Sequence, residues 1–343
     1  MRIAVLGASG YSGLELLRLV LRHPRLELVA ATSERRAGEP VADCFPALRG
    51  LVDLAFEPAN PAKLVGRVDA AFTALPHATA APLVADLRKG GVKVVDISAD
   101  FRLHSEEDYA EWYGPHGAPE IFADGIYGLP EVYGAKLRGA ELIAAPGCYP
   151  TGALLPMLPF LRGGHVEPDV IVDSKSGASG AGRTLADGFL FSELSGNVKA
   201  YKVAAHRHIP EMEQEASLAA GEPVAVTFVP YLLPVIRGIA TSVFLRPKRE
   251  LSAEEARQIL LDAYADAPFV RVLPPGEAPS LQAVRGSNFC DVAAFVDERH
   301  GKLIVLSAID NLVKGAGGQG VQCLNLSEGW AETEGLLEAP LVP

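Results

Sequence analysis

The first 31 residues constrain the fold more than any other stretch, because they have the pattern of one βαβ unit. Residues 3–6 form a short apolar run without alternation, which is typical of a strand buried on both faces. A glycine-rich segment, residues 7–13, follows at once, and residues 14–22 carry helical periodicity. A second apolar strand is predicted over residues 26–31. Such a unit is the building block of doubly wound α/β sheets.

The glycine segment predicts what this unit binds. Its spacing is GxxGxxG, and each glycine has an expected role. Gly7 allows the tight turn after the strand, Gly10 lets the backbone approach a phosphate, and Gly13 allows close packing of the helix. We therefore predict an N-terminal Rossmann-type domain that binds a dinucleotide.

The residues after the second strand bear on cofactor choice. Ser33, Arg35 and Arg36 suit the 2′-phosphate of NADP, whereas Glu34 could bind the ribose hydroxyls of NAD if it points inward. A solvated loop is the third possibility. The two arginines favour NADP.

Later strands of the same sheet are predicted over residues 70–75, 92–97 and 141–145. Residues just past the carboxyl ends of such strands face the ligand crevice. Arg102 is therefore placed to bind an anion, with Asp100 able to orient it. The alternative is a structural Asp–Arg pair within a loop.

Cys148 lies between a Pro-Gly turn and an apolar run, residues 153–161, that reads as a helix. The N–H groups and dipole of a helix start favour a thiolate over a thiol, whose ordinary pKa is about 8.5. The same N–H groups could hold an oxyanion on a carbonyl that the sulfur attacks. The alternative is a small buried cysteine that packs one end of a helix.

A second domain follows the cysteine. A strand at 170–173 opens into a loop of small residues, 174–183, which includes Ser176 and Gly177 and suggests close backbone approach to a ligand. Alternating apolar runs predict a mixed or antiparallel sheet, and a glycine-rich turn leads to a helix at 321–326 that should pack on the first domain. The expected fold is α/β, a Rossmann-type sheet plus an α+β catalytic and dimerisation domain, with residues 1–147 and 313–343 in the first domain and 148–312 in the second.

Two histidines, His206 and His208, lie in a segment that reads as a strand. We expect the two side chains not to serve one site, and His208 is the first choice as acid/base, with His206 the second. A cysteine, a crevice arginine and a dinucleotide domain together indicate one reaction class. A thiolate takes an acyl group as a thioester, and nicotinamide hydride reduces it to an aldehyde.

Composition excludes several other classes. The chain has 343 residues, 49% of them hydrophobic, and a formal charge of −11, which disfavours nucleic-acid binding. The four cysteines are far apart, so neither a metal centre nor a disulfide framework is expected. No apolar stretch reaches 18 residues and no leader pattern is present, so we expect a cytoplasmic protein without a membrane partner.

Five segments give the chain a resemblance to the N-acetyl-gamma-glutamyl-phosphate reductase family, arginine-pathway relatives of aspartate-semialdehyde dehydrogenase: residues 7–13, 98–102, 146–151, 206–211 and 310–315. The resemblance implies a homo-oligomer, dimer or tetramer, built through the second domain. It implies a Cys148 nucleophile, a histidine base in 206–211, and conversion of N-acetyl-L-glutamyl 5-phosphate to the 5-semialdehyde. The NADP contacts it implies are Gly7, Ser9, Gly10, Tyr11, Ser12, Gly13 and Asn311.

Alternatives remain open at this level. The same chemistry could act on a carrier-linked aminoadipyl or glutamyl phosphate of lysine synthesis, or on aspartyl phosphate. A redox-sensing NADP-binding protein would need the cysteine alone. Arg102 and Arg183 are the candidates for the phosphate, and Lys175, Lys199 and Arg207 join Arg183 as candidates for the substrate's carboxylate and acetamido groups.

Overall fold

A computed structural model describes residues 1–183 and 186–342, which divide into two compact units. The first unit comprises Met1–Gly147 and Ala316–Leu337, and the second comprises Cys148–Gly315 with the tail from Glu338. The predicted first domain included this tail. The tail lies instead with the second unit, because the backbone N–H of Leu341 donates to the carbonyl of Arg285 at 2.7 Å and the Arg285 side chain donates back to the Leu341 carbonyl.

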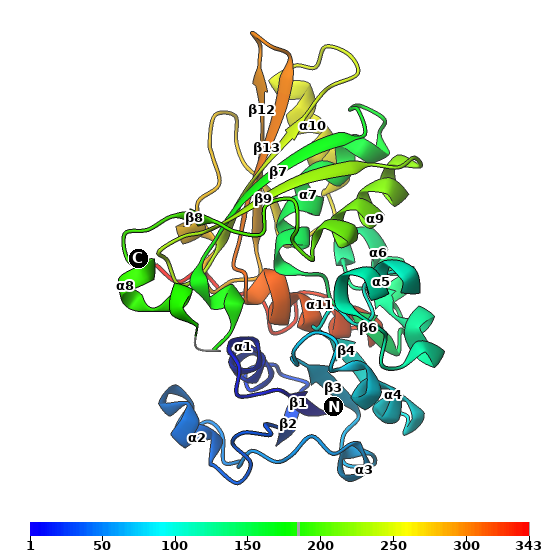
Figure 1. Ribbon diagram of the computed structural model, residues 1–343, viewed down its shortest axis with the longest axis vertical. Helices are drawn as coiled ribbons and strands as arrows, with labels where there is room; N and C mark the ends of the chain where they lie inside the picture. Colours follow the sequence, from blue (N-terminus) through cyan, green and yellow to red (C-terminus); the bar gives the residue numbers. More distant parts are fainter. Residues whose placement is uncertain (184–185, 343) are drawn as a thin grey trace. The chain divides into compact units, whose positions relative to one another are not determined.

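The first unit is built on a parallel six-stranded sheet with strand order β2-β1-β3-β4-β6-β5 (Figure 1). The order reverses at β1, so the ends of β1 and β3 form the crevice where such sheets bind ligands. β3 and β4 are buried throughout, as strands covered on both faces must be. The strands are β1 (Arg2–Leu6), β2 (Glu27–Ala31), β3 (Ala70–Thr73), β4 (Lys93–Asp96), β5 (Ile126–Tyr127) and β6 (Leu142–Ala144).

Helices surround this sheet, and one of them comes from the far end of the chain. Helix α11 (Gly318–Ser327) packs against α1, α6 and β4, as predicted for the C-terminal helix. A Cβ on Gly320 would lie 3.3 Å from Val95 and 3.6 Å from Phe72, so the helix backbone rests directly on the sheet. The other helical segments are α1 (Tyr11–Val20), α2 (Val41–Cys44), η1 (Pro46–Leu48), α3 (Pro61–Leu64), α4 (Ala81–Lys89), α5 (Glu106–Tyr113), η2 (Pro119–Asp124) and α6 (Pro130–Leu137).

The second unit is built on a seven-stranded mixed sheet with strand order β11-β12-β13-β10-β7-β9-β8. The pairs β7–β9 and β11–β12 are parallel and the others antiparallel, which confirms the predicted α/β fold class with a mixed second sheet. The strands are β7 (Asp169–Ser176), β8 (Lys199–Ala200), β9 (Ala225–Leu232), β10 (Ile239–Leu245), β11 (Val270–Val272), β12 (Cys290–Asp297) and β13 (Lys302–Ile309).

Helices α7 (Cys148–Arg162), α9 (Ile209–Ala220) and α10 (Ala253–Ala263) cover one face of this sheet (Figure 1). Burial alternates along the strands accordingly, with Val172 and Val243 buried beneath the helices. The neighbouring side chains point to the opposite face, where Ile171 is 47% exposed and Phe244 36%. The remaining segments are η3 (Ala178–Ala181), η4 (Asp187–Phe189), α8 (Phe191–Leu194), η5 (Leu281–Ala283) and the π-helix η6 (Val313–Gly317).

The predicted strand around the two histidines is wrong. Lys202 and Ala204 have positive φ angles, 47° and 52°, which bend the chain out of an extended path. Residues 206–208 form a turn that leads into α9. The small-residue loop also begins later than predicted, because β7 continues through Ser176 in register with β9 and β10.

Candidate active site

The glycine loop has the close packing expected of a cradle for phosphate. Gly7 has φ 75°, and a Cβ there would lie 2.4 Å from the Ala74 carbonyl oxygen, so β1 and β3 can adjoin only with glycine. A Cβ on Gly13 would lie 2.5 Å from the Gly7 oxygen, which presses α1 against the loop. Gly10 directly precedes α1, so the N–H groups of the first helical turn point toward the loop. These residues fit a dinucleotide.

The segment after β2 presents a hydroxyl pair and an exposed guanidinium. Ser33 is buried, and its hydroxyl lies 2.8 Å from that of Ser9. Glu34 accepts from the Ala59 backbone N–H at 2.8 Å, so its carboxylate is turned toward the neighbouring loop. Arg35 is exposed. Arg36, another predicted phosphate ligand, donates to both carboxylate oxygens of Glu39 at 2.8 Å.

The Arg102 side chain donates hydrogen bonds to backbone carbonyls near the ends of the strands. It is buried, and it donates from Nε to the Ala145 carbonyl at 2.8 Å and from Nη2 to the Ile97 carbonyl at 2.7 Å. These bonds join the end of β4 to the segment that leads to Cys148. The predicted phosphate ligand is thus committed in large part to holding the chain.

Asp100 does not orient Arg102 through the contacts it makes. Its carboxylate accepts from the backbone N–H groups of Ala78, Ala80 and Ala81 at 2.7 to 3.0 Å, and from the hydroxyl of Tyr109 at 3.1 Å. It therefore binds the start of α4 and the loop before it, where Ala78 has φ 63°. The negative charge meets the positive end of the helix dipole there.

Asp96, at the end of β4, is a buried acid that the sequence analysis did not single out. It accepts from the hydroxyls of Thr73 and Ser98, at 2.5 and 2.6 Å. Burial, together with the nearby charge of Asp100, raises the pKa of Asp96 to about 6. An acidic residue directly after the apolar pair Val94 and Val95 of a strand is the sequence signal that could have found it.

Cys148 is the first residue of α7 and is partly exposed. The helix starts five residues earlier than predicted, so the sulfur belongs to the first turn itself, where N–H groups lack helical partners. A cysteine that only packs one end of the helix, which is the alternative considered for Cys148, would be buried. A partly exposed thiol at a helix start is the setting in which a thiolate is stabilised.

The two histidines are brought together, contrary to expectation. Their ring centroids are 4.8 Å apart, and both rings contact Tyr149, the residue that follows Cys148, at 5.4 Å from His206 and 5.9 Å from His208. The turn before α9 brings the two rings into contact.

His206 and His208 are held differently. The backbone N–H of His208 donates to Nδ1 of His206 at 3.1 Å, so Nδ1 is an acceptor and the proton of the neutral ring is on Nε2. Burial, together with the nearby charges of Lys202 and Arg207, lowers the pKa of His206 to about 4. His206 is therefore neutral at physiological pH. His208 occupies the residue before α9 and is 9% exposed.

Two tyrosines that the sequence analysis missed adjoin this cluster. The hydroxyls of Tyr149 and Tyr201 are 2.8 Å apart. Burial raises the pKa of Tyr201 to about 12 and that of Tyr149 beyond its usual range, so both phenols stay protonated. The sequence signal that could have identified them is their position along the chain. Tyr149 lies beside Cys148, and Tyr201 lies near the histidine segment.

Glu211 is a fourth residue that sequence reasoning did not select. It lies in the first turn of α9, three residues after His208, and is 1% exposed. A carboxyl in this position is rarely buried without a role, and an acid one turn after a histidine could have indicated it.

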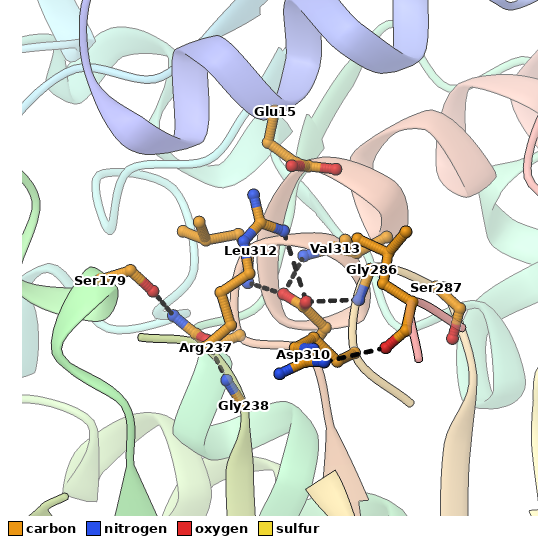
Figure 2. Close-up of polar contacts among 12 residues, drawn as sticks. Glu15, Ser179, Arg237, Gly238, Gly286, Ser287, Asp310, Leu312 and Val313 are labelled. Atoms are coloured by element: carbon orange, nitrogen blue, oxygen red, sulfur yellow. Dashed lines mark hydrogen bonds and ion pairs between the residues drawn. The ribbon is translucent and has the colours of Figure 1, made fainter. Parts of the chain in front are cut away.

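The predicted loop residues of the second unit are engaged with one another. Ser176 donates to the Gly177 carbonyl at 3.0 Å. The Asn311 side chain accepts from the Gly238 N–H at 2.7 Å and donates to the Ser179 hydroxyl at 3.0 Å. Figure 2 shows Ser179 and Gly238 with dashed lines that mark these hydrogen bonds. Lys175 pairs with Asp173 at 2.7 Å, while the other predicted anion ligands are exposed: Arg183, Lys199 and Arg207.

Taken unit by unit, the structure groups Cys148, Tyr149, His206 and His208 in the second unit, and the glycine loop, Ser33 and Arg35 in the first. Within residues 1–183 and 186–342, no cluster of three acidic, histidine or cysteine side chains is arranged to hold a metal ion. None of the helices described there combines the length and apolar character needed to cross a bilayer.

Comparison with known proteins matches both units. The semialdehyde dehydrogenase NAD binding domain family matches residues 2–140, and the semialdehyde dehydrogenase dimerisation domain family matches residues 148–311. The chain is 50% identical to an N-acetyl-gamma-glutamyl-phosphate reductase of Magnetococcus marinus, over 100% of the chain and 99% of the relative. It is 46% identical to one of Citrifermentans bemidjiense, over 100% of each.

Solved structures share the fold at low identity. Aspartate semialdehyde dehydrogenase II of Vibrio cholerae, complexed with ASA, superposes with a TM-score of 0.72 at 18% identity, covering 95% of this chain and 97% of that one. Aspartate semialdehyde dehydrogenase of Candida albicans, with NADP, gives a TM-score of 0.70 at 18% identity and the same coverage.

Proposed function

The chain belongs to the semialdehyde dehydrogenases, within them to the N-acetyl-gamma-glutamyl-phosphate reductase family, and on that premise we propose that it reduces N-acetyl-L-glutamyl 5-phosphate to the 5-semialdehyde with NADPH. It is an enzyme of the phosphorylating aldehyde dehydrogenase type that uses a nicotinamide cofactor. The observation that carries the proposal is Cys148 on the first turn of α7, with two imidazoles packed on its neighbour Tyr149.

Cys148 is the nucleophile in this proposal. Its thiolate attacks the acyl carbon of the substrate, the C–S bond forms, the C–O bond to the phosphate breaks, and inorganic phosphate leaves. First-turn N–H groups of α7 hold the oxyanion that develops. A bound nicotinamide supplies the hydride that reduces the thioester, and the C–S bond then breaks to free the aldehyde and restore the thiolate.

His208 carries the proton to and from the carbonyl oxygen. His206 is excluded from that task near neutral pH, because its pKa of about 4 keeps the ring neutral and its Nδ1 is occupied by the His208 backbone N–H. His206 instead fixes the backbone of His208.

NADP is the preferred cofactor in this proposal. The Glu34 carboxylate, which could have bound ribose hydroxyls, accepts from the Ala59 backbone. Ser33 and the exposed Arg35 stand at the strand end where a 2′-phosphate would lie. Arg183 is the exposed candidate for the substrate phosphate, because Arg102 is used to hold two backbone carbonyls.

The second unit also carries a surface suited to a second copy of the chain. The face of its sheet opposite α7, α9 and α10 presents Ile171 and Phe244 to solvent, and an apolar sheet face of this kind marks an interface. The matching family is named a dimerisation domain. We propose a homodimer joined through this face.

Replacing the nucleophile tests the proposed function. In Cys148→Ser, kcat should fall at least about 10³-fold, because a neutral hydroxyl cannot replace a thiolate, while NADPH binding stays unchanged. The assay is phosphate-dependent oxidation of the semialdehyde with NADP, with cofactor binding followed by fluorescence.

Cys44→Ser is the matched control, since Cys44 is a partly exposed cysteine of the other unit. It should keep the turnover of the unmodified enzyme. Retained turnover in Cys148→Ser would end the proposed mechanism. Faster turnover of aspartyl phosphate than of N-acetylglutamyl phosphate, in a panel of acyl phosphates, would end the proposed substrate.

A further inference from the structure

Behind Cys148 the chain passes through an unusual turn. The segment Val313–Gly317 is a π-helix, and the backbone N–H of Gly315 donates to the carbonyl of Asp310, five residues earlier, at 2.9 Å. π-helical turns are rare, because they insert one residue into a helical path, and they occur mainly at functional sites. This turn follows directly from β13.

Gly315 lies against the cysteine. A Cβ placed on Gly315 would be 2.8 Å from the Cβ of Cys148 and 3.2 Å from its Cα. The φ angle of Gly315 is ordinary, so glycine is needed here for space and not for conformation. The backbone of the π-helical turn therefore packs directly against the base of the Cys148 side chain.

Asp310 fixes the π-helical turn in place. Its side chain is 0% exposed. One carboxylate oxygen accepts from the N–H groups of Leu312 and Val313, at 2.8 and 3.2 Å. The other accepts from the N–H of Gly286 at 2.7 Å and from Nη1 of Arg237 at 3.3 Å. Figure 2 shows these donors converging on the Asp310 carboxylate.

A buried carboxylate that accepts four hydrogen bonds cannot move without losing several of them, so the turn it caps is held rigidly. The chain of contacts runs from the Asp310 carboxylate, through the Leu312 and Val313 backbone, to Gly315 and then to Cys148. Every member belongs to the second unit.

We propose that Asp310 and Gly315 are positioning residues that set the placement of the Cys148 thiolate through the π-helical turn. This inference rests on the proposed role of Cys148 and deepens it. Neither residue touches the substrate or the reacting atoms in this account. A displacement of about 1 Å at a nucleophile can lower turnover about 10²-fold. Small shifts of the π-helical turn should therefore have measurable effects on kcat.

Two substitutions test the inference. Gly315→Ala places a methyl group inside the contact distance of Cys148 and should push the thiol from its position. Asp310→Asn keeps the shape, but its amide nitrogen cannot accept, so one of the two donor pairs is lost. Gly134→Ala is the matched control, because a Cβ there would meet nothing nearer than 4.0 Å.

The measurements are kcat, the KM for NADPH, thermal unfolding, and the rate of Cys148 alkylation by iodoacetamide against pH, followed by peptide mass spectrometry. We expect kcat to fall about 100-fold in Gly315→Ala and about 10-fold in Asp310→Asn. The KM for NADPH should stay within about twofold, and the alkylation midpoint should move to higher pH, because the sulfur leaves the helix N-terminus. Gly134→Ala should match the unmodified enzyme in all of these.

Unchanged kcat and alkylation in a folded Gly315→Ala or Asp310→Asn would overturn the inference. Failure of both variants to fold would assign the two residues to stability and would also overturn it. These outcomes differ from failure of the proposed function, which would appear as retained turnover in Cys148→Ser. An inactive Cys148→Ser beside normal positioning variants would remove only the present inference.

Discussion

At the scale of single residues, the proposed function gives different tasks to the two histidines near Tyr149. Nδ1 of His206 accepts from the backbone of His208, and its pKa of about 4 keeps it neutral at physiological pH. It therefore orients its neighbour. A residue that orients another can be replaced by one that offers the same hydrogen bond, whereas a proton carrier cannot.

His206→Asn should accordingly keep most of the activity, because the side-chain oxygen of asparagine can accept from the His208 N–H. His208→Asn should lower kcat about 10² to 10⁴-fold, because the proposed proton carrier is lost. The profile of kcat/KM against pH for both variants provides the measurement. A larger loss in His206→Asn than in His208→Asn would contradict this division of roles.

The same His206→Asn variant has a consequence for acid stability. The folded-state pKa of His206, about 4, lies below the ordinary value of 6.5, so the unfolded chain binds the proton first. As pH falls from about 6.5 to about 4, this group destabilises the folded state. His206→Asn should therefore lose less stability over that window than the unmodified enzyme, in urea unfolding at a series of pH values.

The chemical role of a residue could be predicted from the sequence where it depends only on that residue's neighbours along the chain. Cys148 before an apolar run, and glycines between a strand and a helix, required no tertiary information. The pairing of His206 with His208 was not readable, because it depends on the positive φ angles of Lys202 and Ala204. Non-glycine residues adopt such angles when the surrounding structure imposes them.

At the scale of elements, the segment after β2 decides the cofactor in the proposed function. Arg35→Ala should lower kcat/KM for NADPH about 10 to 100-fold, because a charge-assisted contact to the 2′-phosphate is lost. The value for NADH should stay within about twofold. Steady-state kinetics with the two cofactors gives the comparison.

Arg49→Ala is a suitable control for that variant, since Arg49 is an exposed arginine of the same unit. Equal losses with NADPH and NADH in Arg35→Ala would count against a 2′-phosphate contact. A loss with NADPH in the control would show that any surface charge of this unit has the same effect.

Element types followed from the sequence more faithfully than element boundaries. Helix α7 starts at Cys148 and not at 153, because Pro150 in a first turn lacks only an N–H that has no helical partner. Apolar periodicity does not report such a start. Helix α9 was missed for a similar reason, since His206–Pro210 gives no strong helix signal before its first turn.

At the scale of the whole molecule, the open sheet face of the second unit should govern assembly. Phe244→Glu places a charge on the apolar face, and burying an unpaired charge at an interface is strongly unfavourable. Sedimentation velocity should show the variant shifted from dimer to monomer. Leu51→Glu, on an exposed leucine of the other unit, should leave the sedimentation coefficient unchanged. A dimeric Phe244→Glu would place the interface elsewhere.

The position of α11 matters during synthesis of the chain. This helix covers Phe72 and Val95 of the first sheet, yet its residues follow Cys148–Gly315, the main part of the second unit, in the sequence. While the ribosome makes the intervening residues, the nascent nucleotide-binding sheet lacks that cover, and its apolar strands are open to wrong association. Residues 148–315 of the second unit are therefore made before the first unit can close. The uncovered strands are therefore the part of the emerging chain that a chaperone would have to shield until α11 is made.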